Sequence, residues 1–260
     1  MNKRNEEAKE DRIFLAALED KFRQCSSQYR TTYTGFLDLR QKSMAEKLCR
    51  ELCKDSPEVS YCFFGGYEEA ERTVCLFFPD YETPDTCHPL QVLRVKKAQG
   101  GRALSHRDYL GALTGLGVKR EMIGDILPDE EGADILILEE ICEFLLLHYD
   151  KAGSTSLAAE AVELNELRIP KRQTVLRKDT VASLRLDNVV ASAFSLPRAK
   201  AAAAIGSGLV FLNGLQAEKT DMQVKEGDKL VLRGKGKAFL RRVGSRTRKD
   251  RIFIETERYV

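Results

Sequence analysis

The sequence lacks the features that several classes of protein require. It contains no tryptophan and three histidines, and no apolar run reaches the roughly 18 residues that a membrane-spanning helix needs. The longest apolar stretch, residues 135–147, is interrupted by glutamates. Residues 1–12 are charged and lack the apolar segment and the small-residue cleavage site of a secretion signal. We therefore expect a cytoplasmic protein that has no membrane partner.

The seven cysteines do not have the spacing of a metal site. All of them lie within the first 142 residues, mostly among apolar neighbours, and their number is odd, which predicts reduced and buried thiols. A structural zinc site uses paired cysteines that are separated by two residues. Here the closest pair, Cys49 and Cys53, has three residues between them, and Cys87-His88 has no second half. We therefore expect no metal and no cofactor.

Motifs that hold nucleotide cofactors are also missing. The sequence contains neither the G-x-G-x-x-G loop that a methyltransferase would place after a strand nor the P-loop G-x-x-x-x-G-K-[ST]. We expect no catalytic residues and no small-molecule substrate.

The distribution of charge is the most informative feature of the composition. The formal net charge is only +2, but residues 168–260 contain 21 lysines and arginines against 9 acidic residues. The preceding part contains 21 basic against 31 acidic residues. Clustered cations that lack internal partners repel one another unless a polyanion neutralises them. The C-terminal part is therefore expected to bind nucleic acid.

The first domain, residues 1–80, is predicted to be a small α+β unit. Apolar residues at helical spacing indicate two amphipathic helices, around 13–22 and 44–52. The runs 59–64 and 73–78 are typical of strands, and a Gly-Gly turn with an acidic loop joins them.

The second domain, residues 81–170, is predicted to be a ferredoxin-like plait, the architecture that RNA-recognition motifs also use. The predicted strands carry leucine, valine and isoleucine where stacking aromatic rings would stand in a true RNA-recognition motif. The expected elements, in the order strand, helix, strand, strand, helix, strand, cover 90–95, 105–116, 122–127, 133–138, 139–149 and 164–169.

The third domain, residues 171–260, is predicted to begin with a basic connector, 171–178, and to end in a basic extension. Two helices are expected, at 184–190 and 198–205, with Ser195 as the cap of the second helix and Pro197 in its first turn. Strands at 209–212 and 229–233 should follow, with Asn213-Gly214 as a type I′ hairpin turn. The expected fold is two helices against a small twisted hairpin.

The start of the second helix in this domain is suited to binding phosphate. Exposed backbone N–H groups at a helix start favour an anion, and Arg198 and Lys200 add cationic donors. Arg233, Lys235 and Lys237 form a second basic edge, with glycines between them that let a backbone approach closely. We expect these five cations to contact the phosphate backbone of an RNA.

Several spaced motifs occur in order in the C-terminal third. They are RLD at 185–187, S-x-x-R-A at 195–199, Asn-Gly at 213–214, and G-D followed by L-R-G-K-G within 227–236. Together they resemble the small RNA-binding domain of ribosomal protein S-four, which also occurs in bacterial tyrosyl-tRNA synthetases and pseudouridine synthases. The resemblance implies an S-four-type RNA-binding domain and adds Arg185, Ser195 and Asn213 to the candidate RNA-binding residues.

Three longer motifs carry a resemblance over the rest of the chain. They are FLDLRQ at 36–41, FFGGYEEAER at 63–72 and LSHRDYLGALTGLGVKREMIGDIL at 104–127. These segments resemble the YlmH-like proteins of Gram-positive bacteria, which are encoded near cell-division genes and are related to ribosome-associated quality control. The resemblance implies a non-catalytic protein of three domains that binds rRNA of the large ribosomal subunit beside tRNA.

The first two domains are acidic, so we expect them to be poor RNA binders that touch protein or tRNA. Their best basic candidates are Arg94, Lys96, Lys97, Lys119 and Arg120. A monomer is expected.

Two alternative functions remain open at this point. One is an interaction protein that holds division or translation proteins while its RNA binding is incidental; pull-down before and after ribonuclease treatment would distinguish it. The other is an accessory of an RNA-modifying enzyme. The RLD triplet also occurs in pseudouridine synthases, where the aspartate is catalytic, but here Asn188 and Val189 continue a helix. We therefore interpret Asp187 as structural.

Overall fold

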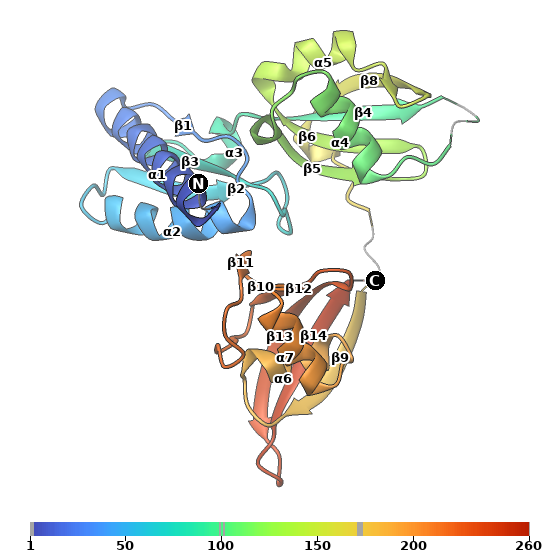
Figure 1. Ribbon diagram of the computed structural model, residues 1–260. Coiled ribbons are helices and arrows are strands. Elements are labelled where there is room, and N and C mark those ends of the chain that lie inside the picture. Colours follow the sequence, from blue (N-terminus) through green and yellow to red (C-terminus); the bar gives the residue numbers. More distant parts are fainter. Residues whose placement is uncertain (1–2, 99, 101, 171–173, 260) are drawn as a thin grey trace. The chain divides into compact units, whose positions relative to one another are not determined.

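The computed structural model describes residues 3–98, 100, 102–170 and 174–259. The chain forms two compact units, Met1–Pro170 and Lys171–Val260 (Figure 1). The fold class is α+β with several sheets, as expected from the sequence. The first unit contains two of the three sheets, so the further division into domains 1–80 and 81–170 stays a prediction.

The first sheet, in the order β1-β3-β2, carries the two N-terminal helices on one face. Helix α2 begins with a capping box between Asp38 and Gln41, which satisfies backbone N–H groups of its first turn. Phe22 from α1 meets Phe77 from β3 with ring centroids 5.7 Å apart. The elements are α1 Lys3–Gln28, β1 Thr32–Tyr33, α2 Leu39–Leu52, β2 Val59–Phe64, β3 Val74–Pro79 and α3 Pro84–Cys87.

The second sheet has the ferredoxin-like order β5-β6-β4-β8, with the short strand β7 beyond β8 and every pair antiparallel. Helices α4 and α5 pack on one face, where Tyr109 and Leu145 are buried. The elements are β4 Leu90–Lys97, α4 His106–Gly115, η1 Arg120–Met122, β5 Ile123–Pro128, β6 Gly132–Leu138, η2 Glu139–Ile141, α5 Cys142–His148, β7 Lys151–Ala152, β8 Thr155–Val162 and η3 Leu164–Glu166.

The sequence predicts the last strand of this sheet at 164–169, and the structure shows that this prediction is wrong. Residues Leu164–Glu166 form a 3₁₀ turn, and the strand that pairs with β4 is Thr155–Val162. This segment contains three alanines and one glutamate among its eight residues, so its own strand preference is weak. Pairing with β4 and burial of Leu157 decide its structure.

The two sheets of the first unit pack face to face. Val74 and Leu76 of β3 meet Val92 of β4 and Leu136 of β6 in one buried cluster. The face of the ferredoxin-like sheet that is not covered by α4 and α5 is therefore partly buried against the first sheet. In an RNA-recognition motif this face carries the stacking rings. Packing against the first sheet explains the aliphatic side chains at these positions, whereas Lys96 and Glu160 at the other end of the same face remain about half exposed.

Residues of the three segments 36–41, 63–72 and 104–127 meet at this packed boundary. Asp125 is 7% exposed and accepts hydrogen bonds from the Tyr67 hydroxyl at 2.7 Å and from the backbone N–H of Arg72 at 3.1 Å. The Arg72 guanidinium donates to the carbonyl of Phe36 at 2.7 Å. A side chain at Gly124 would lie 2.6 Å from the Phe36 ring, so glycine is needed there.

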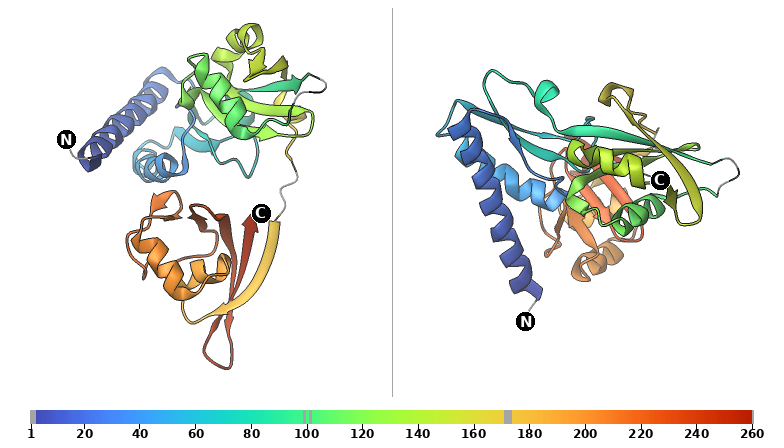
Figure 2. Two further views of the ribbon diagram at one scale, coloured as in Figure 1. Left: turned by 45° about the vertical axis from the view of Figure 1, so that its right-hand side comes forward. Right: turned by 90° about the horizontal axis from the view of Figure 1, so that it is seen from above.

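The second unit is one six-stranded sheet, in the order β11-β10-β12-β13-β14-β9. Helices α6 and α7 cover one face of it, as the left view of Figure 2 shows. The elements are β9 Thr174–Val181, α6 Leu186–Ala193, α7 Arg198–Gly206, β10 Val210–Leu212, β11 Leu215–Gln216, β12 Lys229–Leu232, β13 Gly236–Arg246 and β14 Ile252–Tyr259. Both helices and the hairpin were expected, and Asn213 and Gly214 have the positive φ values, 50° and 82°, of a type I′ turn.

Strands β9, β13 and β14 of this sheet, and the short strand β11, were not expected from the sequence. Residues 174–178, interpreted as connector, begin β9, whereas 171–173 lie outside the described residues. The basic extension forms β13 and β14, and β14 pairs with β9 along its full length. Ser195 does not cap α7, because Pro197 occupies the N-cap position and Ser195 itself has a φ of 54°.

Among the described residues, no helix is long and apolar enough to cross a membrane. The cysteines are free, and the sulfurs of Cys49 and Cys75 lie 3.7 Å apart in the first core. Burial raises the pKa of Cys25 to about 11 and that of Cys53 to about 12. These thiols are therefore protonated, and weakly nucleophilic, near neutral pH.

Strand β9 defines where an independently folding C-terminal fragment must start. A fragment of residues 171–260 should unfold cooperatively, whereas one of residues 182–260 lacks β9 and the buried Val181. Losing the burial of Val181 alone lowers the free energy of unfolding by about 2 kcal/mol. Strand β14 also loses its backbone hydrogen bonds to β9. We expect a clearly lower urea midpoint for the shorter fragment. Equal midpoints would show that β9 does not belong to the folded unit.

Candidate nucleic-acid interface

Two arginines of the candidate site share one buried carboxylate. Arg185 is the N-cap residue of α6, and Arg198 is the first residue of α7. Arg185 Nε lies 3.2 Å from Oδ1 of Asp187, and Nη2 of Arg198 lies 2.8 Å from Oδ2. The Asp187 side chain is 5% exposed, and those of Arg185 and Arg198 are 36% and 56% exposed. The carboxylate therefore holds two partly exposed guanidinium groups at the surface.

Asp187 is ionised in this arrangement. Burial by itself would raise the pKa of Asp187, but hydrogen bonds from Arg185 and Arg198 outweigh burial and hold the pKa below its ordinary value. Its Oδ1 also accepts the backbone N–H of Asn188 at 3.0 Å. These contacts agree with the interpretation of Asp187 as a structural residue.

The remaining candidates on the helical side lie close by. Lys200 is exposed in the first turn of α7. The Ser195 hydroxyl accepts a hydrogen bond from Arg177 of β9, so Ser195 links the loop between the helices to the sheet.

The second basic edge lies at the other end of α7. Arg233 follows β12 and donates its backbone N–H to the carbonyl of Leu209, which comes after the last residue of α7. A helix of nine residues is about 13 Å long. The structure therefore separates Arg198 and Lys200 from Arg233, Lys235 and Lys237 instead of joining them in one constellation.

The side chains of the second edge stack on aromatic rings. The Arg233 guanidinium lies 4.8 Å from the centroid of Phe211, and Lys237 Nζ lies 4.7 Å from that of Tyr259. Val210 and Leu212 of β10 face the core, so alternation along the strand directs Phe211 to the other face of the sheet. These two cations therefore line the sheet face that α6 and α7 leave uncovered. Lys235 is exposed in the turn between β12 and β13.

Asn213 has a structural contact for its side-chain amide. Its Nδ2 donates to Asp228 at 2.8 Å, and its Oδ1 accepts the backbone N–H of Lys229 at 2.8 Å. Asn213 therefore ties its own turn to the start of β12.

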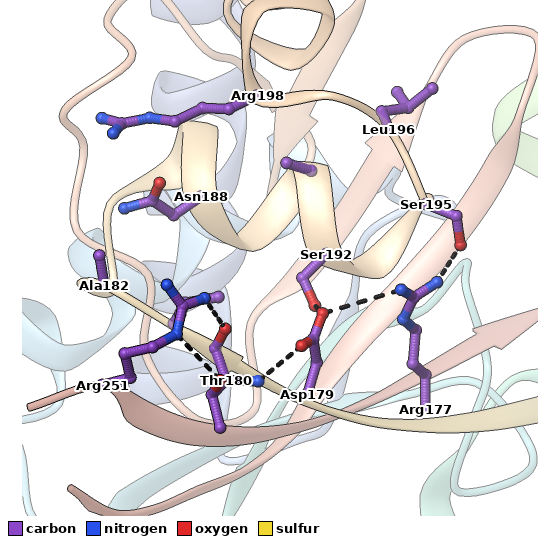
Figure 3. A pocket seen from close by; sticks show the side chains of 12 residues that line it. Arg177, Asp179, Thr180, Ala182, Asn188, Ser192, Ser195, Leu196, Arg198 and Arg251 are labelled. Atoms are coloured by element: carbon purple, nitrogen blue, oxygen red, sulfur yellow. Dashed lines mark hydrogen bonds and ion pairs between the residues drawn. The ribbon is translucent and has the colours of Figure 1, made fainter. Parts of the chain in front are cut away.

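Sequence reasoning missed two arginines that lie near the helical group. A pocket of about 470 Å³ opens between β9, α6 and the loop before α7, and its lining includes Arg177 and Arg251 as well as Ser195 and Arg198 (Figure 3). Arg177 belongs to β9 and Arg251 directly precedes β14. The only signal for them was the general excess of basic residues, because neither strand was recognised.

The basic candidates of the first unit are mostly engaged inside it. Arg94 binds the buried Asp134 through two hydrogen bonds, at 2.9 and 2.8 Å. Lys96 pairs with Glu160 at 2.9 Å, and Arg120 donates to the carbonyl of Ile123 at 2.6 Å. Lys119 lies 3.9 Å from a carboxylate oxygen of Glu121 and is largely exposed. These ion pairs reduce the positive potential that an RNA would meet on this unit.

Two models of RNA-binding domains match the chain. Residues 86–166 match the model described as "Putative RNA-binding domain in YlmH", and residues 184–230 match the model of the S4 domain. A protein of Bacillus subtilis (strain 168), "Ribosome-associated protein quality control protein P2", is 35% identical over 252 residues, which cover 96% of each chain. The chain belongs to the YlmH family.

A solved YlmH structure has the same fold over part of the chain. "Cell division protein ylmH from Streptococcus pneumoniae" superposes with a TM-score of 0.50 and 24% identity, covering 62% of this chain and 95% of that one. The S-four-type domain expected from the sequence is thus confirmed as an S4 domain, and the resemblance to YlmH-like proteins is confirmed over nearly the whole chain. Strands β13 and β14 and the residues Arg177 and Arg251 lie outside the segment that the S4 model matches.

Replacing Asp187 with asparagine tests the shared carboxylate. Asp187→Asn removes one partner of two ion pairs, and because both arginines are partly exposed we expect a loss of about 1–2 kcal/mol, less than for a fully buried pair. The depressed pKa of Asp187 contributes stability above the unfolded pKa of about 4, and this contribution is lost as the pH falls further. Urea unfolding at pH 7 and pH 3 should show a smaller difference between variant and wild type at pH 3. A constant difference would contradict the ion-pair account.

Proposed function

We propose that this YlmH-family protein binds structured RNA without catalysing a reaction, and that its target is rRNA of the large ribosomal subunit together with adjacent tRNA. The observation that carries the proposal is the pair of guanidinium groups, Arg185 and Arg198, that the buried Asp187 holds at the surface of the S4 domain. We further propose that the protein acts as a cytoplasmic monomer in ribosome-associated quality control or translation. The name of its Bacillus subtilis relative supports this context.

The geometry favours reading of shape over reading of sequence. The guanidinium group is planar and binds phosphate oxygens through two parallel hydrogen bonds, and its position here is set by contacts within the domain. Folded RNA presents phosphates and 2′-hydroxyls in a fixed arrangement, so a rigid surface can select it without contacting base edges. The amide of Asn213, the one amide among the candidates, already bonds within its own hairpin.

A second candidate function is an interaction protein linked to cell division. Helix α5 exposes Phe144 by 41% and Leu147 by 78%, and such side chains are common in protein interfaces. The Streptococcus pneumoniae structure carries the name of a cell division protein. Pull-down with and without ribonuclease distinguishes the two functions, because only a protein partner would be retained after the RNA is digested.

Binding should depend steeply on salt. If Arg198, Lys200, Arg233, Lys235 and Lys237 contact about five phosphates, the log–log slope of affinity against salt should be near −4. Affinity should then fall roughly 10²- to 10³-fold between about 50 and 200 mM salt. Arg198→Ala should weaken binding more than Lys235→Ala, because an anchored guanidinium binds bidentately while an exposed ammonium acts as a point charge. A flat salt dependence would rule out phosphate contacts.

Gradient sedimentation of cell lysate tests the target. Wild-type protein should migrate with the large ribosomal subunit at low salt, and Arg198→Glu should abolish this while remaining folded. Arg248→Glu is the matched control, since Arg248 is an exposed arginine in the turn between β13 and β14. Co-migration with the small subunit only, or with no ribosomal particle, would contradict the proposal.

A further inference from the structure

The pocket beside β9 combines three arginines that come from distant parts of the sequence. Figure 3 shows Arg177 and Arg251 along β9 with Asp179 between them, and Arg198 at the opposite side of the pocket, at the start of α7. The pairing of β14 with β9 brings the start of β14 to the end of β9, where Ile252 is the register partner of Val181. From the position before Ile252, the Arg251 side chain reaches back to Thr180.

The two arginines along β9 are held in place by hydrogen bonds to neutral groups, and Arg177 also lies near a carboxylate. Nε of Arg251 donates to Thr180 Oγ1 at 3.0 Å, and its Nη2 donates to the Thr180 carbonyl. Arg177 donates to the Ser195 hydroxyl and lies 3.8 Å from Asp179. A guanidinium has five N–H donors, more than these contacts occupy. Each group is thus oriented at one edge and retains donors for a ligand.

The electrostatics of the pocket favour an anion. The lining contains three arginines and one carboxylate, Asp179. That carboxylate accepts hydrogen bonds from Ser192 Oγ at 2.7 Å and from the backbone N–H of Thr180 at 2.7 Å. Burial would raise the pKa of Asp179, but these bonds and the nearby arginines hold it below its ordinary value. The carboxylate is therefore occupied within the protein, and the lining retains an excess of positive charge.

We propose that this pocket receives a backbone phosphate of the bound RNA, held by Arg177 and Arg251 together with Arg198. The inference rests on the proposed RNA-binding function and extends it to residues outside the segment that the S4 model matches. Continuity supports the choice of ligand, because Arg198 belongs both to the pocket and to the pair of arginines on Asp187. Strands β9 and β14 thus add a second wall to the RNA-binding surface of the S4 domain.

Salt titration of RNA binding by the full-length protein tests the pocket. Arg251→Gln removes the charge and keeps a side chain that can bond Thr180, and Arg177→Gln serves as a second variant if the first unfolds at a lower temperature. Each should weaken binding about 10-fold and reduce the magnitude of the salt slope by about 1. Arg248→Gln carries the same charge change in the same hairpin, outside the lining, and should leave the slope unchanged.

The outcomes separate this inference from the function on which it rests. If wild-type protein binds no RNA, the proposed function and the pocket assignment both fail. If it binds RNA but the folded pocket variants behave like Arg248→Gln, only the pocket assignment is overturned. Calorimetric titration with inorganic phosphate at constant ionic strength distinguishes the source of the phosphate. Weak, non-saturating uptake is expected for an RNA phosphate, whereas saturable binding that Arg251→Gln abolishes, with RNA affinity unaffected, would overturn the assignment in favour of a small anion.

Discussion

The carboxylate of Asp187 determines where the cations at the start of α7 lie. An exposed arginine explores many rotamers, and ordering it on binding RNA costs conformational entropy. Here Arg185 and Arg198 approach the two oxygens of one nearly buried group, so part of that entropy is lost on folding and not on binding. The same contacts keep the carboxylate ionised at low exposure. Stability of the S4 domain and geometry of its surface therefore depend on one side chain.

The strands outside the S4 segment enlarge this surface. Pairing of β14 with both β13 and β9 makes the sheet six strands wide and carries Arg251 to Thr180. It also places Tyr259 beside Lys237, on the face that the helices leave uncovered. The domain thus has cations on two sides, next to the helices and on the uncovered face of the sheet. A single short contact with RNA would need cations on only one side.

The two units use their charges differently. In the first unit, Arg94 and Arg168 surround the buried Asp134, whose pKa is lowered to about 2 because these hydrogen bonds outweigh burial. Arginines there form ion pairs within the unit, and part of the sheet face that would stack bases in an RNA-recognition motif is buried. In the second unit the arginines are anchored at one edge and exposed at the other. This difference supports assigning phosphate binding to the S4 domain.

Local signals in the sequence were sufficient for the helices, the Asn213-Gly214 turn, the order of elements in the ferredoxin-like sheet and the S-four-type motif, because periodicity, caps and turns act over a few residues. They also pointed to Arg198 as a candidate. Strands β9, β13 and β14 escaped recognition because basic side chains on their outward positions hide the alternation of Val181, Leu240 and Ile254, which face the core. Only the tertiary structure could bring Arg177, Arg251 and Arg198 into the lining of one pocket and place Arg233 at the far end of α7. Sheet pairing joins residues far apart in the sequence, and no local pattern encodes which strands will meet.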